Sequence, residues 1–426
     1  MNLNDKKNHD FLVTPFGKFV LIYFPDGVKY FKITPNNEYI QPSNEEKLEL
    51  DKVFVKKIDS FDSFYKYHQN LSIEDLIKAN PELPNDKDFI NLVNHIEKII
   101  PDGCKENLYR NLSTLKILYN QPDVPGVASY NGKYNTISFA TNQEETLKRT
   151  LRLETIDAQT AAYHLSSTLF HEILHMASSF YDEKTGIYYS GLSTINLGED
   201  AIHSSRAINE GVTAMIEHHF YPECLRNTGY LEEICIAGHL NSIVGLDNIL
   251  KTYFSAKGIE PIKNELYGLG VDRELIDILF PRVEINYITK EERVTSPNTA
   301  LANLETTLID CSEAKLRQMI DNGKITTEEE LNNHLMVIQP NVLTTDKAPF
   351  FRRGIENCLN MNEVDEWLEN LKKNIHQHYH ARTKNESLAN SNLTKDDFLS
   401  MISQEPIIEE LSQVEPNIEV ELGRSR

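Results

Sequence analysis

Two histidines and a glutamate lie close together in the stretch FHEILHMASS, residues 170–179. His171 and His175 are four residues apart, so on a helix their side chains lie on one face, one turn apart. Two imidazoles at that spacing can bind one ion at about 2.0–2.1 Å, the bond length of a zinc site. Glu172 projects about 100° around the helix from His171, where its carboxylate can take a proton from metal-activated water. The spacing therefore predicts a zinc site with an adjacent base, provided that a third ligand exists.

A second feature is needed, because HExxH is expected by chance about 0.04 times in a chain of this composition. The stretch AINEGVTAMIEHHF supplies it, with Glu210 placed 35 positions after His175. Asn209 precedes this glutamate and Gly211 follows it, at the start of a second amphipathic pattern. A carboxylate there could reach the metal from a facing helix. The apolar residues around the first motif predict a buried helix, in which unpaired histidines and a glutamate would be costly.

These residues resemble the gluzincins, the thermolysin-like zinc peptidases, in which HExxH is followed on a later helix by an Asn-Glu pair. The resemblance covers about residues 124–220 and implies that His171, His175 and Glu210 bind one Zn²⁺ ion per chain. It also implies that Glu172 is the catalytic base. The strand TISFA, residues 136–140, is expected to be an edge strand that holds an extended substrate by strand addition. The family's supporting Asp, one turn after the third ligand, has no counterpart, since that position is Ala214.

Other residues are weaker candidates for this site. His164 is expected to lie in the core or behind a ligand, and the histidines of HQHYH, residues 376–380, on a solvated helix end. Three residues are alternative ligands: Asp200, His203 and Glu217. Three tyrosines could stabilise an oxyanion or simply pack: Tyr188, Tyr189 and Tyr221. Metzincins fit less well, because Ser178 and Tyr181 stand where that family needs Gly and His.

The elements that would position the site follow from periodicity. Residues 17–24 and 28–33 predict two strands joined by a turn at 25–27. Residues 44–118 predict helices, with Ser72 as an N-cap, and helices are expected to dominate 144–220 apart from a loop or short strand near 190. Residues 230–254 and three or four segments after 291 are also helical in pattern. The acidic tail, residues 403–426, is expected to be loose.

Composition narrows the class of protein. The formal charge of -21 argues against nucleic acid as a partner, because binding to phosphates needs clustered Lys and Arg. The chain has no apolar run long enough for a signal peptide or a membrane span, which predicts a cytoplasmic protein without a membrane partner. Export by a signal-independent route is left open. Its five cysteines are scattered, without a CxxC pair, and are expected to be reduced thiols. Oligomeric state is left open.

Together these patterns predict an α+β, predominantly helical protein. The expected domains are residues 1–85, a β-hairpin with helices; 86–290, a zinc-metallopeptidase-like domain; and 291–426, a helical region with the acidic tail. The predicted function is hydrolysis of a peptide or protein substrate by metal-activated water with Glu172 as base. The alternative is a catalytically weak or inactive zincin-like scaffold that serves as a protein-interaction module. A third reading, a helical protein with a coincidental motif, predicts no metal.

Overall fold

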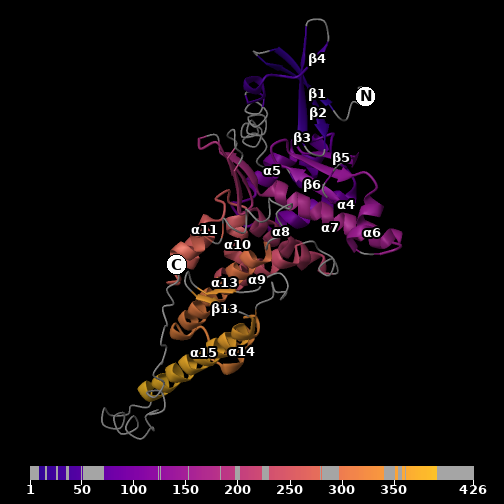
Figure 1. The fold of residues 1–426 in the computed structure, drawn as a ribbon. Coiled ribbons are helices and arrows are strands. Elements are labelled where there is room, and N and C mark those ends of the chain that lie inside the picture. Colours follow the sequence, from indigo (N-terminus) through magenta and orange to yellow (C-terminus); the bar gives the residue numbers. More distant parts are fainter. Residues whose placement is uncertain are drawn as a thin grey trace, which may run out of the picture.

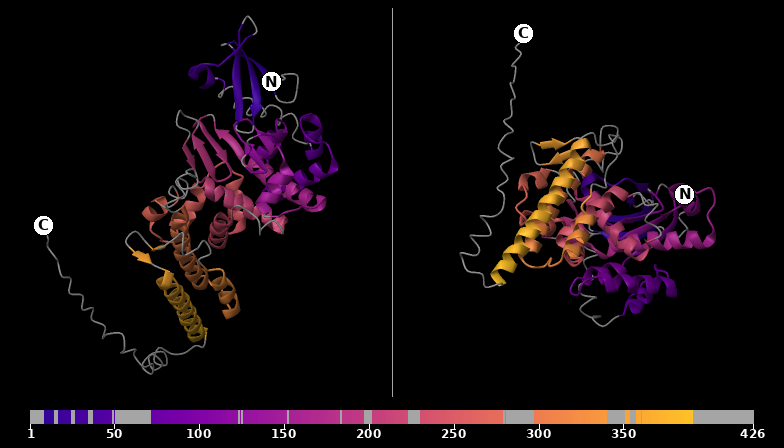
Figure 2. Two further views of the ribbon diagram at one scale, coloured as in Figure 1. Left: turned by 45° about the vertical axis from the view of Figure 1, so that its right-hand side comes forward. Right: turned by 90° about the horizontal axis from the view of Figure 1, so that it is seen from below.

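The computed structural model describes residues 9–14, 17–24, 27–34, 38–48, 50, 72–122, 124, 126–151, 153–182, 184–196, 202–222, 230–278, 280, 297–339, 351–353, 357–359 and 361–390. The predicted α+β class is confirmed, and helices predominate in the described part of the chain. The molecule is elongated, with an N-terminal sheet at one end and the last helices at the other (Figure 1). The left view of Figure 2, turned by 45°, shows the same arrangement, with the helix and sheet elements of residues 72–280 between the two ends.

The N-terminal sheet has four antiparallel strands in chain order: β1 (His9–Thr14), β2 (Gly17–Phe24), β3 (Gly27–Ile33) and β4 (Tyr39–Ile40). The predicted hairpin is therefore confirmed as β2 and β3, which pair from Lys18↔Ile33 to Phe24↔Gly27. Residues 25 and 26 of the predicted turn lie outside the described residues.

Further along the described chain lie α3 (Ile73–Ala79), α4 (Lys87–Ile99) and α5 (Glu106–Leu112). Ser72 caps α3 as predicted, in a capping box with Asp75. The prediction of helix up to residue 118 is wrong at its end, because β5 (Lys116–Gln121) is a strand. Its backbone pairs in parallel with β7, a long-range partner that local periodicity does not reveal.

A three-stranded sheet precedes the motif helix, in the order β5, β7 (Thr136–Ala140), β6 (Ala128–Asn131). TISFA is β7, so the prediction of a strand is confirmed, but its placement at an edge is wrong. The strand pairs with β5 on one side and β6 on the other, and all five of its residues are buried. The turn after Asn131 folds β6 back onto β7, which leaves β6 as the edge strand of the described sheet beside the motif helix α7.

The region that carries the motifs has three helices and a sheet. The helices are α6 (Gln143–Leu151), α7 (Ala158–Ala177) and α8 (Arg206–Phe220). The residues that connect α7 to α8 in the sequence form an antiparallel sheet. Its strand order is β11 (Ile202–Ser204), β10 (Ser193–Asn196), β9 (Ile187–Ser190), β8 (Ser179–Asp182). The prediction that helices dominate this region is confirmed before and after the sheet. Near residue 190, however, the structure has the four strands β8 to β11 where the patterns predict one short strand or a loop.

The predictions of helix over residues 230–254 and after residue 291 are confirmed, and a helix that the patterns did not predict lies over residues 260–267. The helices are α9 (Leu231–Val244), α10 (Leu246–Tyr253), α11 (Glu260–Tyr267), α13 (Pro297–Asp321), α14 (Glu328–Met336) and α15 (Met361–Asn390). Two short strands that the patterns did not predict, β12 (Phe351–Arg353) and β13 (Asn357–Leu359), pair with each other in antiparallel orientation. The acidic tail lies outside the described residues.

Buried apolar side chains form two clusters. The first, the central cluster, includes residues from Ile73 to Cys311 and encloses the inner faces of α7, α8 and α9. The second, the C-terminal cluster, includes residues from Ala302 to Tyr379 and contains Trp367. Helix α13 contributes to both clusters. The predicted boundaries after residues 85 and 290 stay predictions.

Two smaller observations concern the described residues as a whole. Among the described helices, none is both long enough and apolar enough to cross a membrane. Cys104, Cys235 and Cys311 are free thiols, and burial raises the pKa of Cys235 to about 11 and that of Cys311 to about 12. Cys235 and Cys311 are therefore protonated thiols at neutral pH.

Candidate metal centre

Helices α7 and α8 pack against each other and bring the three predicted ligands together. His171 Nε2 lies 3.1 Å from His175 Nε2 and 3.3 Å from Glu210 Oε2. His175 Nε2 lies 3.2 Å from the same carboxylate oxygen. The three side chains belong to residues between 7% and 9% exposed. Three buried polar groups thus point at one another from two helices.

These distances fit a tetrahedral ion. Ligand atoms at 2.0–2.1 Å from a zinc ion are about 3.3–3.4 Å apart, and the three pairs here lie within 0.3 Å of that spacing. The donor set of two imidazole nitrogens and one carboxylate oxygen is also one that zinc accepts, with the fourth position left for water or substrate. The residues present therefore fit the metal that the motif predicts.

Local structure sets the positions of the ligands. The spacing of four residues stacks His171 over His175 on α7, whose end is held by Asn111, a donor to the carbonyls of Met176 and Ser179 at 2.7 and 2.8 Å. On α8, Gly211 follows Glu210 where α9 crosses closely. A Cβ at Gly211 would lie 2.2 Å from the carbonyl oxygen of Glu233. Glycine at this position therefore permits the α8–α9 contact beside the third ligand.

Glu217 supports His171 from behind. Its Oε2 lies 2.9 Å from Nδ1 of His171, and its Oε1 accepts a hydrogen bond from the Ser167 hydroxyl. A carboxylate on Nδ1 fixes the tautomer that leaves Nε2 free for a metal ion, and it makes the ring a stronger ligand. Glu217 was expected only as an alternative ligand, and the position where the family has its supporting Asp is the buried Ala214. Glu217, one turn further along α8, contacts the histidine instead.

Asn209 links His175 to the neighbouring sheet. Its Nδ2 lies 3.4 Å from Nδ1 of His175, and its Oδ1 accepts the Leu192 N–H at 2.8 Å. The turn between β9 and β10 approaches the amide closely, because a Cβ at Gly191 would lie 2.2 Å from Oδ1. The outer edges of both histidine rings are thus held by polar side chains of α8.

Glu172 lies beside the three ligands and not among them. Its Oε2 accepts the backbone N–H of Tyr130, on β6, at 2.7 Å. Burial raises the pKa of the Glu172 carboxyl, although His171 and His175 act in the opposite direction. A carboxylate with a raised pKa is a better proton acceptor near neutral pH.

The charges of the residues at the centre balance around His171. Burial would lower the pKa of this ring, but the carboxylates of Glu210 and Glu217 outweigh it and raise the pKa well above 6.5. Burial would raise the pKa of Glu210, but His175 and His171 hold it far below its usual range. At neutral pH a proton on His171 therefore sits between two ionised glutamates, in the place that a cation would take.

Among the described residues, the metal-binding group of this centre contains only His171, His175 and Glu210. Asp200 and the side chain of His203 lie outside the described residues, and His164 is half-buried in an edge contact with Tyr163. The Tyr221 hydroxyl lies 3.2 Å from the Ser166 hydroxyl. The hydroxyl of the buried Tyr188 lies next to the backbone of Gly132. Tyr230 stacks on His171, with ring centroids 5.9 Å apart and ring planes that differ by 9°. No sequence signal singled it out.

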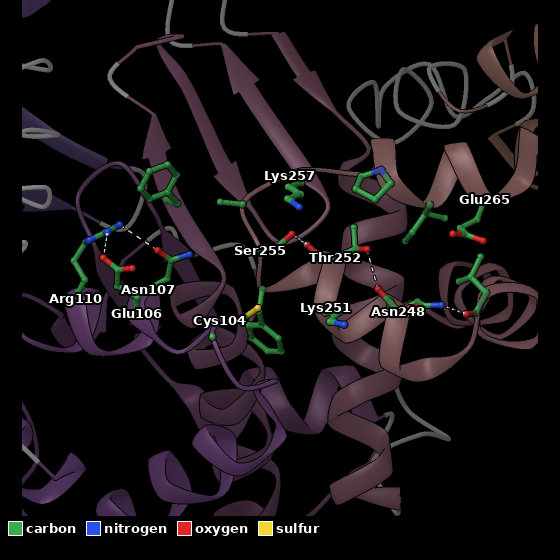
Figure 3. A pocket seen from close by; sticks show the side chains of 17 residues that line it. Cys104, Glu106, Asn107, Arg110, Asn248, Lys251, Thr252, Ser255, Lys257 and Glu265 are labelled. Carbon is green, nitrogen blue, oxygen red and sulfur yellow. Dashed lines mark hydrogen bonds and ion pairs between the residues drawn. The ribbon is translucent and has the colours of Figure 1, made fainter. Parts of the chain in front are cut away.

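A cavity of about 740 Å³ lies between α5, β8, α10 and α11 (Figure 3). Arg110, Lys251 and Lys257 line it together with Glu106 and Glu265. The Arg110 guanidinium donates to Glu106 and Asn107 at 3.2 and 3.1 Å. Neither the three candidate ligands nor Glu172 lines this cavity, so it is separate from the candidate metal centre.

No known protein family, curated protein or solved structure matches the chain. The chemistry of the centre is therefore argued from the types, distances and burial of its own residues.

Proposed function

We propose that the chain is a zinc-dependent peptidase in which His171, His175 and Glu210 hold the metal and Glu172 is the general base. The observation that carries the proposal is the approach of the three ligand atoms to 3.1–3.3 Å of one another, with Glu172 beside them. A zinc ion bound there would polarise a substrate carbonyl and lower the pKa of a water molecule.

Glu172 would handle the protons. Its carboxylate takes a proton from the attacking water and passes it to the nitrogen of the departing amine, so the group ends as it began. The Tyr130 N–H holds one carboxylate oxygen, and the other stays available for this transfer. The buried surroundings that raise the pKa of Glu172 bring it closer to the value that suits a base at neutral pH.

Strand β6 would align the substrate. The Tyr130 N–H bonds to Glu172 and not to β7, so the outer edge of β6 faces the base. An extended peptide that added to this edge would run past Glu172 with its backbone held by main-chain hydrogen bonds. In this proposal β6, and not the strand TISFA (β7), is the edge strand that binds an extended substrate.

The test compares metal content and peptide hydrolysis in variants without an affinity-tag histidine run. We expect His171→Ala and Glu210→Gln each to lose one zinc ion relative to the wild type. Glu172→Gln should keep zinc and lose hydrolysis of a peptide library by about 10²–10⁴-fold. The matched control is Glu154→Gln, at an exposed position ahead of α7, and it should change neither quantity.

Two results would contradict the proposal. Hydrolysis by Glu172→Gln at the wild-type rate would remove the glutamate from the mechanism. Zinc binding by a wild type that cleaves no peptide would favour the alternative, a zinc-binding scaffold that acts as an interaction module.

A further inference from the structure

A second group of metal-binding side chains lies at the other end of the molecule, near the start of α14 and the middle of α15. HQHYH is in the interior of the 30-residue helix α15, not at a helix end as the sequence suggested. Tyr379, in this segment, packs in the C-terminal cluster and donates from its hydroxyl to the Thr326 carbonyl at 3.1 Å. This contact fixes the middle of α15 against the residues that lead into α14.

His376 and His380 are four residues apart on α15, so both rings lie on one face, one turn apart. Their ring centroids are 6.2 Å apart and the planes differ by 22°. Glu328, the first residue of α14, faces them, with Oε1 at 4.0 Å from Nε2 of His380. One potential ligand atom from each of the three residues lies within 4.8 Å of the others.

The neighbouring polar residues have other partners. His378, between the two histidines in sequence, points to Asp321 at the end of α13, with Nε2 at 2.8 Å from Oδ1. Glu330 caps α14 together with Thr327. Glu328 takes no part in that cap, so its carboxylate can turn toward the two imidazoles.

We propose that Glu328, His376 and His380 form a second site, for a divalent transition-metal ion, that joins the start of α14 to the middle of α15. Two imidazoles select ions such as Zn²⁺, Co²⁺, Ni²⁺ or Cu²⁺ over Mg²⁺ and Ca²⁺, which prefer oxygen ligands. The side chains of His380 and Glu328 are 60% and 59% exposed, so both can rotate to close the distance to about 3.3 Å that a zinc ion requires. Water completes the coordination.

The site does not depend on the proposed peptidase activity and is measured apart from it. The full chain is prepared without affinity-tag histidines and with His171→Ala, which removes a ligand of the first centre. Zn²⁺ bound per chain is measured by equilibrium dialysis and plasma mass spectrometry. In this background, the change of His376 and His380 to Gln should lower bound zinc by one ion per chain, and His378→Gln should leave it unchanged.

Thermal unfolding, followed by circular dichroism, gives an independent measurement. An ion that binds only the folded state raises Tm. Zn²⁺ should therefore raise Tm in the His171→Ala and His171→Ala/His378→Gln chains, more than Mg²⁺ does at equal concentration. The chain that lacks His376 and His380 should lose this difference. Equal zinc content in the His378 and His376/His380 variants, or an equal zinc-induced rise in Tm, would overturn the proposal.

Discussion

The Nδ1 nitrogen of His171 faces a carboxylate from the same helix that carries Glu210. Glu217 thus aligns the ring, and its negative charge makes Nε2 a stronger donor to a cation. We expect Glu217→Gln to weaken zinc binding by about 10–100-fold, the usual effect of removing such a partner. Competition with a chromophoric chelator measures the affinity. Glu265→Gln makes the same chemical change away from the centre and should have no effect, whereas equal affinity in all three proteins would contradict the role of Glu217.

The proton on His171 makes zinc binding depend on pH. The pKa of this ring is raised well above 6.5 by Glu210 and Glu217 despite burial, so below that pKa a zinc ion must displace a proton. Apparent affinity should rise about tenfold per pH unit through the neutral range and level off above the pKa of His171. In Glu217→Gln, which lacks one of the two carboxylates, the levelling should occur at lower pH. Titration calorimetry across neutral and mildly alkaline pH would measure both curves, and a flat profile would exclude this proton.

At this scale the sequence was informative where spacing alone determines geometry. A separation of four on one helix brings His171 and His175 together, and the Asn-Glu pair marked the facing helix. Glu217 was harder to assign because it lies seven residues after Glu210, about two helical turns, which places it on the same face but further from the metal. Tyr230 reaches His171 through tertiary packing, which leaves no local pattern.

The contact between α8 and α9 depends on a glycine. Alanine is the better helix former by about 1 kcal/mol, but a Cβ at Gly211 would lie 2.2 Å from the Glu233 carbonyl oxygen, and the backbone there must move. We expect Gly211→Ala to lower the free energy of unfolding by about 1–3 kcal/mol and to weaken zinc binding, because Glu210 is the adjacent residue. Urea titration measures the first effect, and chelator competition the second.

Gly238, on α9, is the matched control, since nothing lies within 4 Å of a Cβ built there. Gly238→Ala should leave zinc affinity unchanged and raise stability by up to about 1 kcal/mol. A Gly211→Ala protein as stable as Gly238→Ala would show that the helices separate without cost.

Among the elements, those with local signals were predicted well. The Ser72 cap and the apolar periodicity of Lys87–Ile99 define helices whose stability is partly intrinsic to the segment. Strands depend on distant partners, so periodicity alone predicts helix over the residues of β5 and assigns β7 to the edge that β6 occupies. The strands of the β8–β11 sheet have only three or four residues each, too few to show a clear alternation.

At the scale of the whole molecule, α13 connects the two hydrophobic clusters. Its buried residues Leu304 and Leu308 belong to the central cluster, and Glu305 lies 3.0 Å from His239 on α9. A chain truncated after residue 290 would lose these contacts and leave the buried His239 without this carboxylate. We expect a loss of stability of at least about 3–6 kcal/mol from the two leucines alone, a large share of the usual total.

Thermal unfolding by circular dichroism would measure the loss. A chain that ends after residue 325 keeps α13 and should retain the central cluster. Equal Tm values for the two truncated chains would show that the region before residue 290 is independent, as the predicted domain boundary implies.

The position of Trp367 gives the protein a natural optical label. It is the chain's one tryptophan, and its side chain is buried in the C-terminal cluster. Selectively excited indole emission therefore reports on α13, α14 and α15, while the far-ultraviolet signal sums over every helix. If the central and C-terminal clusters unfold at different temperatures, the transitions seen by tryptophan emission and by far-ultraviolet circular dichroism will not coincide. The temperature at which the emission wavelength shifts, compared with the circular-dichroism transitions, will then show which cluster unfolds first.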